Sequence, residues 1–214
     1  IINISFWACF EQAGTSLTLF ADRNVDRVIF GWAMPASMTQ FFNPFFIIVF
    51  GSIFSVMWVK LSKIGKKPSI PLKFCFGIVQ LALGFLVTKV GFQFVNESFQ
   101  VPLLTLVFLY MLHTTGELFL SPIGLSMVTK LSPKSMAGTA MGAWFLSFAI
   151  ANYVGGKIAA ITGGHGGSDE AMSIGEGLNQ YLDIFSTIGY VLLGIALIIF
   201  LLNKPIKKLM HGVE

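Results

Sequence analysis

The sequence predicts an all-α membrane protein of six transmembrane helices. The first observation is composition: of 214 residues, 55% are hydrophobic and only 11% are charged, with a mean hydropathy of +0.78. A soluble domain carries about 25% charged residues, so most of this surface must face lipid. The second observation is that the apolar residues form runs of about 20, the length of a spanning helix. The third is that lysine-rich and acidic connections alternate between the runs.

Six apolar runs are long enough to cross a bilayer. The first begins at once and is interrupted only by Glu11, and the fourth is interrupted only by Glu117. The third is short, but Lys73 and Lys89 can extend their amines toward water along its surface. Prolines at or near several ends support the boundaries. The predicted spans are residues 1–21, 32–59, 71–89, 101–129, 136–161 and 181–203.

The charges of the connections predict the orientation. Ten of the 14 basic residues follow the second, fourth and sixth runs, in the stretches 60–73, 130–134 and 204–208. The positive-inside rule places these stretches in the cytoplasm. Both termini then lie inside, as an even number of spans requires. Because the lysines form short clusters between apolar runs, the net charge of +4 indicates topology and not nucleic-acid binding.

Three further features are expected to carry no chemistry. Cys9 and Cys75 lie within apolar runs, where cysteine usually packs as a small hydrophobic residue and not as a disulfide. His165 lies in a glycine-rich connection, residues 163–168, and we interpret it as a solvated loop histidine and not as a metal ligand or pH sensor.

Because an apolar run starts at residue 1, we expect the chain to be a piece of a longer protein.

Glu11 and Glu117 are the informative residues of the sequence. A charged carboxylate in the middle of a membrane costs at least about 2.5 kcal/mol, so each should pair with a base or take up a proton. Helical spacing places other polar or aromatic side chains on the faces of both glutamates. Such a face lines a helix–helix contact or a water-filled cavity, and we favour the cavity. The neighbours are Trp7, Thr15 and Thr18 for the first glutamate, and Tyr110, His113, Thr114, Ser121 and Gly124 for the second.

Two prolines inside the runs predict broken helices beside these glutamates. Pro44 and Pro122 each free a backbone carbonyl one turn earlier, at Gln40 and Leu118. Transporters commonly place binding sites at such breaks, although a plain packing kink is the alternative. In the fifth run, residues 138–142 predict a small-residue contact between helices. Trp144 points away from that contact, toward a cavity or toward lipid.

Four segments resemble bacterial proton-dependent oligopeptide transporters. Residues 6–24 resemble the seventh span of that family, and the segment Phe42-Asn-Pro-Phe resembles the eighth. The segment His113-Thr-Thr-Gly-Glu-Leu-Phe-Leu-Ser-Pro-Ile-Gly resembles the tenth span, and Met141-Gly-Ala-Trp-Phe the eleventh. The matches occur in the family's order and cover essentially the whole chain.

The resemblance implies the C-terminal half of a major facilitator fold, in which two six-helix halves bind substrate between them. It implies symport of di- and tripeptides by alternating access, with protons as the coupling ion and no other cofactor. The implied partners are the lipid bilayer of the bacterial inner membrane and the N-terminal half. That half would supply the family's Glu-x-x-Glu-Arg motif and the fourth-span lysine, which this chain lacks.

The resemblance also implies roles for particular residues. Asn43 and Glu117, with Ser121 nearby, would accept the amine of the peptide. Glu11 would form an ion pair with an arginine of the missing half and couple proton entry to the gate. Asp22 would either join an outer gate or remain an exposed loop acid. Broad apolar walls for variable peptide side chains would come from Trp7, Phe10, Trp144 and Phe145.

Other functions are compatible with parts of this pattern. A serine hydrolase would need a serine next to a histidine, but His113 and Ser121 lie two turns apart on one predicted helix. A metalloenzyme would use the pair His113 and Glu117, for which the spans offer no third ligand. A transporter of another solute stays open because one architecture serves many substrates. A subunit whose polar faces only join helices also stays open.

Overall fold

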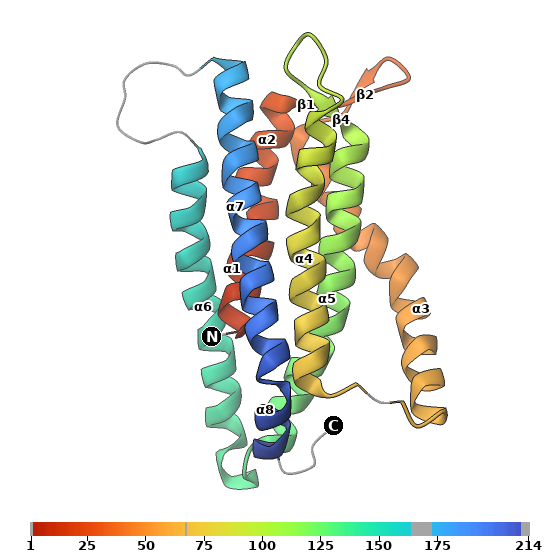
Figure 1. The fold of residues 1–214 in the computed structure, drawn as a ribbon, viewed down its shortest axis with the longest axis vertical. Helices are drawn as coiled ribbons and strands as arrows, with labels where there is room; N and C mark the ends of the chain where they lie inside the picture. The colour runs from red at the N-terminus through yellow and green to blue at the C-terminus, as the bar shows by residue number, and fades with distance from the viewer. Residues whose placement is uncertain (1, 67, 164–172, 211–214) are drawn as a thin grey trace.

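A computed structural model describes residues 2–66, 68–163 and 173–210 as a bundle of helices (Figure 1). Within these residues, five helical stretches are long and apolar enough to cross a membrane. A chain this rich in long apolar helices is an integral membrane protein. The five stretches centre on α3 (Phe42–Lys63), α4 (Ile70–Phe92), α5 (Leu103–Leu131), α6 (Ala137–Thr162) and α7 (Ile174–Leu201).

The first predicted span is not a continuous helix. It consists of α1 (Ile2–Phe10), the 3-10 helix η1 (Glu11–Gly14) and α2 (Ser16–Asn24). Between them, Thr15 adopts a φ of −127° and a ψ of −99°, which ends the helical hydrogen-bond pattern. The hydroxyl of Thr18 donates to the carbonyl of Ala13, at 2.8 Å. This side-chain bond satisfies a carbonyl at the break, so helical spacing across residues 11–18 does not hold.

The second predicted span begins too early. Residues 28–33 form a hairpin in which β2 (Val28–Ile29) pairs with β3 (Trp32–Ala33). Phe30 and Gly31 at its turn both have positive φ, 49° and 83°, the geometry of a tight hairpin turn. The helix starts only at the 3-10 helix η2 (Ala36–Phe41), which continues into α3. The predicted break near Pro44 therefore takes the form of a change from the 3-10 helix η2 to the α-helix α3.

The sixth predicted span begins too late. α7 starts at Ile174 because Ser173 forms a capping box with Glu176, a signal visible in the sequence as Ser-x-x-Glu. At the other end the chain turns at Leu202 into the short helix α8 (Asn203–Leu209). The remaining spans agree with their predicted bounds to within a few residues.

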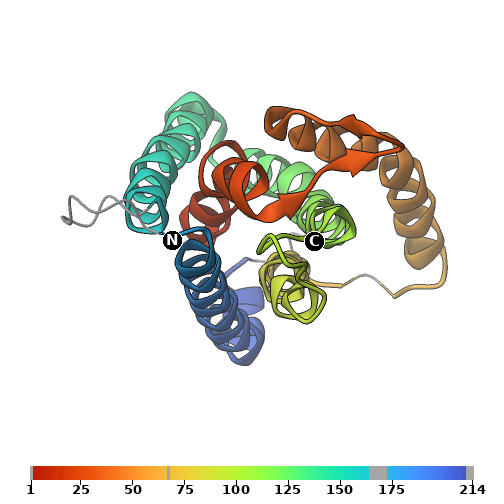
Figure 2. The ribbon, with the colours of Figure 1, turned by 90° about the horizontal axis from the view of Figure 1, so that it is seen from above.

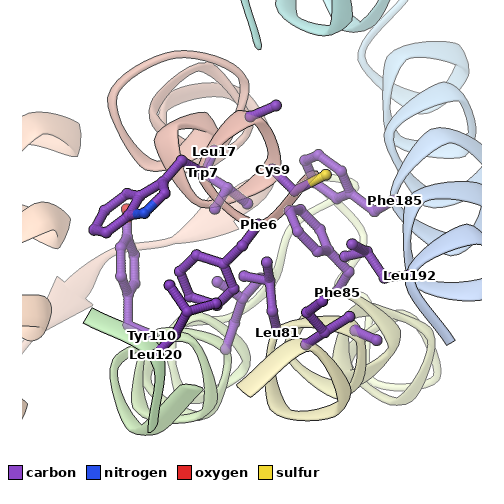
Figure 3. Close-up of a cluster of buried hydrophobic side chains, with 14 of the residues drawn as sticks. Phe6, Trp7, Cys9, Leu17, Leu81, Phe85, Tyr110, Leu120, Phe185 and Leu192 are labelled. Carbon is purple, nitrogen blue, oxygen red and sulfur yellow. The ribbon is translucent and has the colours of Figure 1, made fainter. Parts of the chain in front are cut away.

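The core forms where α4 lies between α5 and α7 and faces α1 and α2 (Figures 2 and 3). Phe6, Leu81, Phe85 and Phe185 meet there, each with an exposed fraction of 0%. α4 and α5 approach closely: a Cβ added at Gly116 would lie 2.7 Å from the carbonyl oxygen of Gly77. In contrast, α3 buries only Phe46 and stands at the edge of the bundle.

One end of the bundle is held by a short parallel pair, β1 (Val25–Asp26) with β4 (Val101–Pro102). The lysine-rich stretches lie at the opposite end, where α3, α5 and α7 finish and the 3-10 helix η3 (Lys134–Met136) leads into α6 (Figure 1). The sequence prediction that these stretches share one end is confirmed. Cys9 and Cys75 are free and buried as predicted, whereas His165 lies outside the described residues.

Candidate functional site

Asn43 joins α3 to the polar face of α5. Its side-chain amide donates to Oε2 of Glu117 and to the hydroxyl of Thr114, both at 3.1 Å. The Thr114 hydroxyl in turn donates to the carbonyl of Tyr110, at 2.7 Å. Asn43 can reach α5 because it lies in the first turn of α3, beside Pro44. The structure thus brings together two of the three residues predicted to bind the amine of a substrate.

The third predicted residue, Ser121, lies one turn further along α5 than Glu117 and is half-buried. It precedes Pro122, which lies inside the continuous helix α5, so the break predicted at this proline is not formed. The same face continues to Gly124, where the ring of Trp144 from α6 packs. A Cβ added at Gly124 would lie 2.6 Å from that ring. Trp144 therefore points into the bundle, toward α5, and not toward lipid.

Glu11 begins η1, where the first helix breaks, and is exposed within this chain. The hydroxyl of Tyr110 on α5 donates to the carbonyl of Ala13 in η1, at 3.5 Å, so this break lies against α5. Two carboxylates in one region repel, and a proton or a cation on either one relieves that repulsion. The break in the first helix and the polar face of α5 thus form one acidic site with Asn43 at its edge.

Gln12, next to Glu11, is fully buried and was not singled out in the sequence. Its amide donates to the carbonyl of Ala8 at 2.8 Å and to that of Gly155 on α6 at 3.1 Å. Its oxygen accepts from the hydroxyl of Ser16, at 2.5 Å. The sequence signal that could have identified Gln12 is a polar amide within an apolar run. It satisfies backbone groups at the helix break and links the break to α6.

The four predicted wall residues have different environments. Trp7 is buried, with an exposed fraction of 8%, and Phe145 is 58% exposed. Phe10 packs edge-on against Trp7, with ring centres 5.2 Å apart. Phe148, which the sequence did not single out, connects the set: its ring lies 4.9 Å from Trp7, 6.1 Å from Phe145 and 6.3 Å from Trp144. The aromatic residues thus form one chain from α1 to α6.

Other predicted features lie apart from this site. Asp22 forms an ion pair with Arg27, at 3.1 Å, at the base of the β2–β3 hairpin. The small residues Gly138 and Gly142 contact no helix: a Cβ added at either would meet no atom within 4 Å. The predicted helix contact there is not formed within the described residues. The close approach of α6 to α1 occurs at Gly155, where an added Cβ would lie 3.1 Å from the Ala8 carbonyl oxygen.

His113 faces the α4–α5 interface and not the acidic site. Its exposed fraction is 1%, and its ring centre lies 4.7 Å from that of Phe85. Gly84 leaves the space for this ring, since a Cβ there would overlap it. Neither ring nitrogen has a hydrogen-bond partner of ordinary geometry among the described residues. In the same residues no three His, Cys, Asp or Glu side chains gather as a metal site would require.

Comparisons with known proteins agree on one family. The family model "POT family" matches residues 1–171. The chain is 37% identical over 211 residues to the peptide transporter YePEPT of Yersinia enterocolitica, covering 98% of this chain and 39% of that protein. It is 35% identical over 209 residues to the dipeptide and tripeptide permease A of Edwardsiella piscicida, covering 98% of this chain and 42% of that protein.

A solved structure of a peptide transporter POT in complex with sulfate has the same fold. The TM-score is 0.84 at 32% identity, and the match covers 99% of this chain and 40% of that one. The chain therefore spans about two fifths of the length of the relatives that it matches. These relatives are named as transporters and permeases and not as enzymes.

Proposed function

The chain belongs to the POT family, and we propose that it forms the C-terminal, six-helix half of a major facilitator transporter for di- and tripeptides. Protons would be the coupling ion, and the bacterial inner membrane the location, with both ends of the segment in the cytoplasm. The names of the relatives support the substrate class. The clustering of lysine-rich stretches at one end of the bundle supports the orientation.

In this proposal the broken stretch from α1 to α2 is the first of the six spans. Its 23 residues, Ile2–Asn24, would extend about 34 Å at the helical rise of 1.5 Å per residue, enough to cross the hydrocarbon core. A break at membrane depth is tolerated where protein groups satisfy the freed backbone. Gln12 supplies such groups, because it bonds to carbonyls on both sides of the α1–α6 contact.

The bond between Asn43 and Glu117 is the observation that carries the function. The amine of a peptide is a cation that needs acceptors. Since the NH₂ of Asn43 donates to Glu117 and Thr114, its carbonyl oxygen remains as an acceptor. The Glu117 carboxylate offers further lone pairs and a charge. We propose that the amine binds between these two side chains, with Ser121 one turn away as an additional acceptor.

Glu11 is proposed to link this site to the missing half. An exposed carboxylate within an apolar segment needs a partner, and an arginine of the N-terminal half would provide one. Phe145, Gly138 and Gly142 are also exposed on α6, which fits a face covered by that half. When Glu11 takes up a proton, the ion pair opens and the repulsion of Glu117 falls. A single protonation would thereby both open the gate and change the binding of the peptide amine.

The remaining site residues receive supporting roles. Phe10, Trp144 and Phe145 would form apolar walls against variable peptide side chains. Trp7 would act mainly behind them, because its indole is buried and donates to Asn3 at 3.0 Å. The ion pair of Asp22 with Arg27 would stiffen the outer end of the first span, where an outer gate closes.

Uptake of a labelled dipeptide by the full-length transporter tests this function. The protein is reconstituted in vesicles with an imposed proton gradient, and unlabelled dipeptides, tripeptides, sugars and cationic drugs are offered as competitors. Accumulation that collapses with the gradient, and that only the peptides compete for, is expected. Competition by another class of solute, without competition by peptides, would assign the same architecture to a different substrate.

A further inference from the structure

A cavity of about 530 Å³ extends from the lysine-rich end of the bundle along α5 to Leu118, the residue after Glu117. Its walls come from α3, α5 and the start of α4 with the connection before it. Its size is in the range of cavities that hold a small organic molecule. The residues that line it are Gly51, Phe54, Ser55, Trp58, Leu61, Ser62, Pro68, Ile70, Lys73, Leu118, Pro122, Ile123, Ser126 and Lys130.

The lining of this cavity changes from apolar to basic along its length. α3 contributes Gly51 and Phe54 first and Ser62 last, while α5 runs in the same direction from Leu118 to Lys130. Eleven to twelve helical residues correspond to about 16–18 Å. The apolar part therefore lies toward the middle of the bundle, and the polar part near the lysine-rich end, where a membrane would present its headgroups.

The basic part of the cavity has a defined structure. The Lys73 ammonium lies 5.0 Å from the centre of the Trp58 ring, and that ring packs edge-on against Phe119, with ring centres 5.6 Å apart. Trp58 thus supports the amine at the wall, and Lys130 approaches from the end of α5. Among the residues that the structure describes, no acidic side chain lines the cavity. Ammonium groups and serine hydroxyls are hydrogen-bond donors suited to a phosphate group.

We propose that this cavity binds one anionic phospholipid of the leaflet at the lysine-rich end. The phosphodiester would lie between Lys73 and Lys130, and one acyl chain would extend along Phe54, Leu118 and Ile123 toward Gly51. The change from basic to apolar lining favours a lipid over a free anion, which would leave the apolar part unoccupied.

Native mass spectrometry of the full-length transporter tests this proposal. The protein is equilibrated with phosphatidylglycerol or phosphatidylcholine, and retained lipid is counted. Phosphatidylglycerol should be retained about ten-fold better than phosphatidylcholine. The double variant Lys73→Gln/Lys130→Gln should lose that preference. The matched control Lys204→Gln/Lys208→Gln removes the same charge from α8 at the same end, and should keep it.

A second variant tests the apolar part independently. Gly51 lines the cavity, and a Cβ there meets no atom within 4 Å. Gly51→Leu therefore adds a side chain at the cavity wall and should lower retention of both lipids. Gly194→Leu, at an equally open position on α7, is its control. Equal retention of the two lipids by the wild type, or unchanged retention in Gly51→Leu, would overturn the proposal. So would displacement of the lipid by inorganic phosphate or by a dipeptide.

Discussion

The side-chain amide of Asn43 donates a hydrogen bond of 3.1 Å to the carboxylate of Glu117 across the α3–α5 contact. This bond fixes the orientation of both groups, because the same amide also bonds to Thr114. A neutral amide held against a carboxylate in an apolar bundle leaves acceptors on both side chains. A peptide amine placed between them would complete the arrangement.

Replacing Asn43 by alanine should weaken peptide binding. The change removes an acceptor for the amine and frees Glu117 to move, and a bond to a charged group contributes about 1.5–3 kcal/mol. We expect the KM for dipeptide uptake to rise about ten-fold or more. Asn179→Ala is the control, since Asn179 is exposed on α7 and donates to the carbonyl of Gly175 within its own helix. An unchanged KM in Asn43→Ala would remove this residue from the site.

Replacing Gln12 by alanine should destabilise the contact of α1 with α6. The change leaves a buried serine hydroxyl and backbone carbonyls without their partner, at a cost of about 1–3 kcal/mol. Thermal unfolding in detergent should begin several degrees earlier. Gln180→Ala is a matched control, because Gln180 also donates to a carbonyl on α6, at Ile161, but in an exposed position. Equal shifts in the two variants would contradict the role given to Gln12.

Replacing Gly116 by alanine should separate α4 from α5. The added methyl group would lie 2.7 Å from the carbonyl oxygen of Gly77, and overpacking of this kind costs about 1–3 kcal/mol. The melting temperature should therefore fall. In Gly194→Ala, where the methyl group meets open space, it should stay or rise slightly because alanine favours helix. The same melting measurement compares both.

Single cysteines should report the orientation of the bundle. Cysteines placed at Val28 and Asn96 should react with an impermeant maleimide added outside intact cells, and one at Lys134 should react only after permeabilisation. Cys9 and Cys75 are buried and should contribute little background. Labelling of position 134 from outside would reverse the orientation that the lysines predict.

Most of the bundle was predictable because apolar runs and lysine clusters are strong local signals. The break at Thr15 was not, because it depends on the side chains of Thr18 and Gln12 bonding to backbone groups of other turns. The hairpin after Asp26 was hidden by its apolar composition, since Val28 and Trp32 resemble the start of a span. Average hydropathy does not distinguish a broken helix or an apolar hairpin from a continuous spanning helix.

The candidate site was predictable in part for a similar reason. Helical spacing placed Thr114, Glu117 and Ser121 on one face, and the family resemblance added Asn43, which lies on another helix. Spacing alone did not separate His113 from that face, although the ring packs into the α4–α5 interface beside Gly84. It also did not show Phe148 as the centre of the aromatic chain, because contacts between α1 and α6 depend on the tertiary fold.

Glu11 and Glu117 are proposed to couple proton entry to peptide binding, and transport by Glu11→Gln and Glu117→Gln tests this coupling. The full-length protein is reconstituted, and peptide accumulation under a proton gradient is compared with peptide exchange without one. Glu97→Gln, in an exposed loop, is the control. Accumulation should be lost in both variants, with exchange retained in Glu11→Gln and weakened in Glu117→Gln. Gradient-driven accumulation at the wild-type level in both variants would show that neither carboxylate couples proton entry to peptide binding.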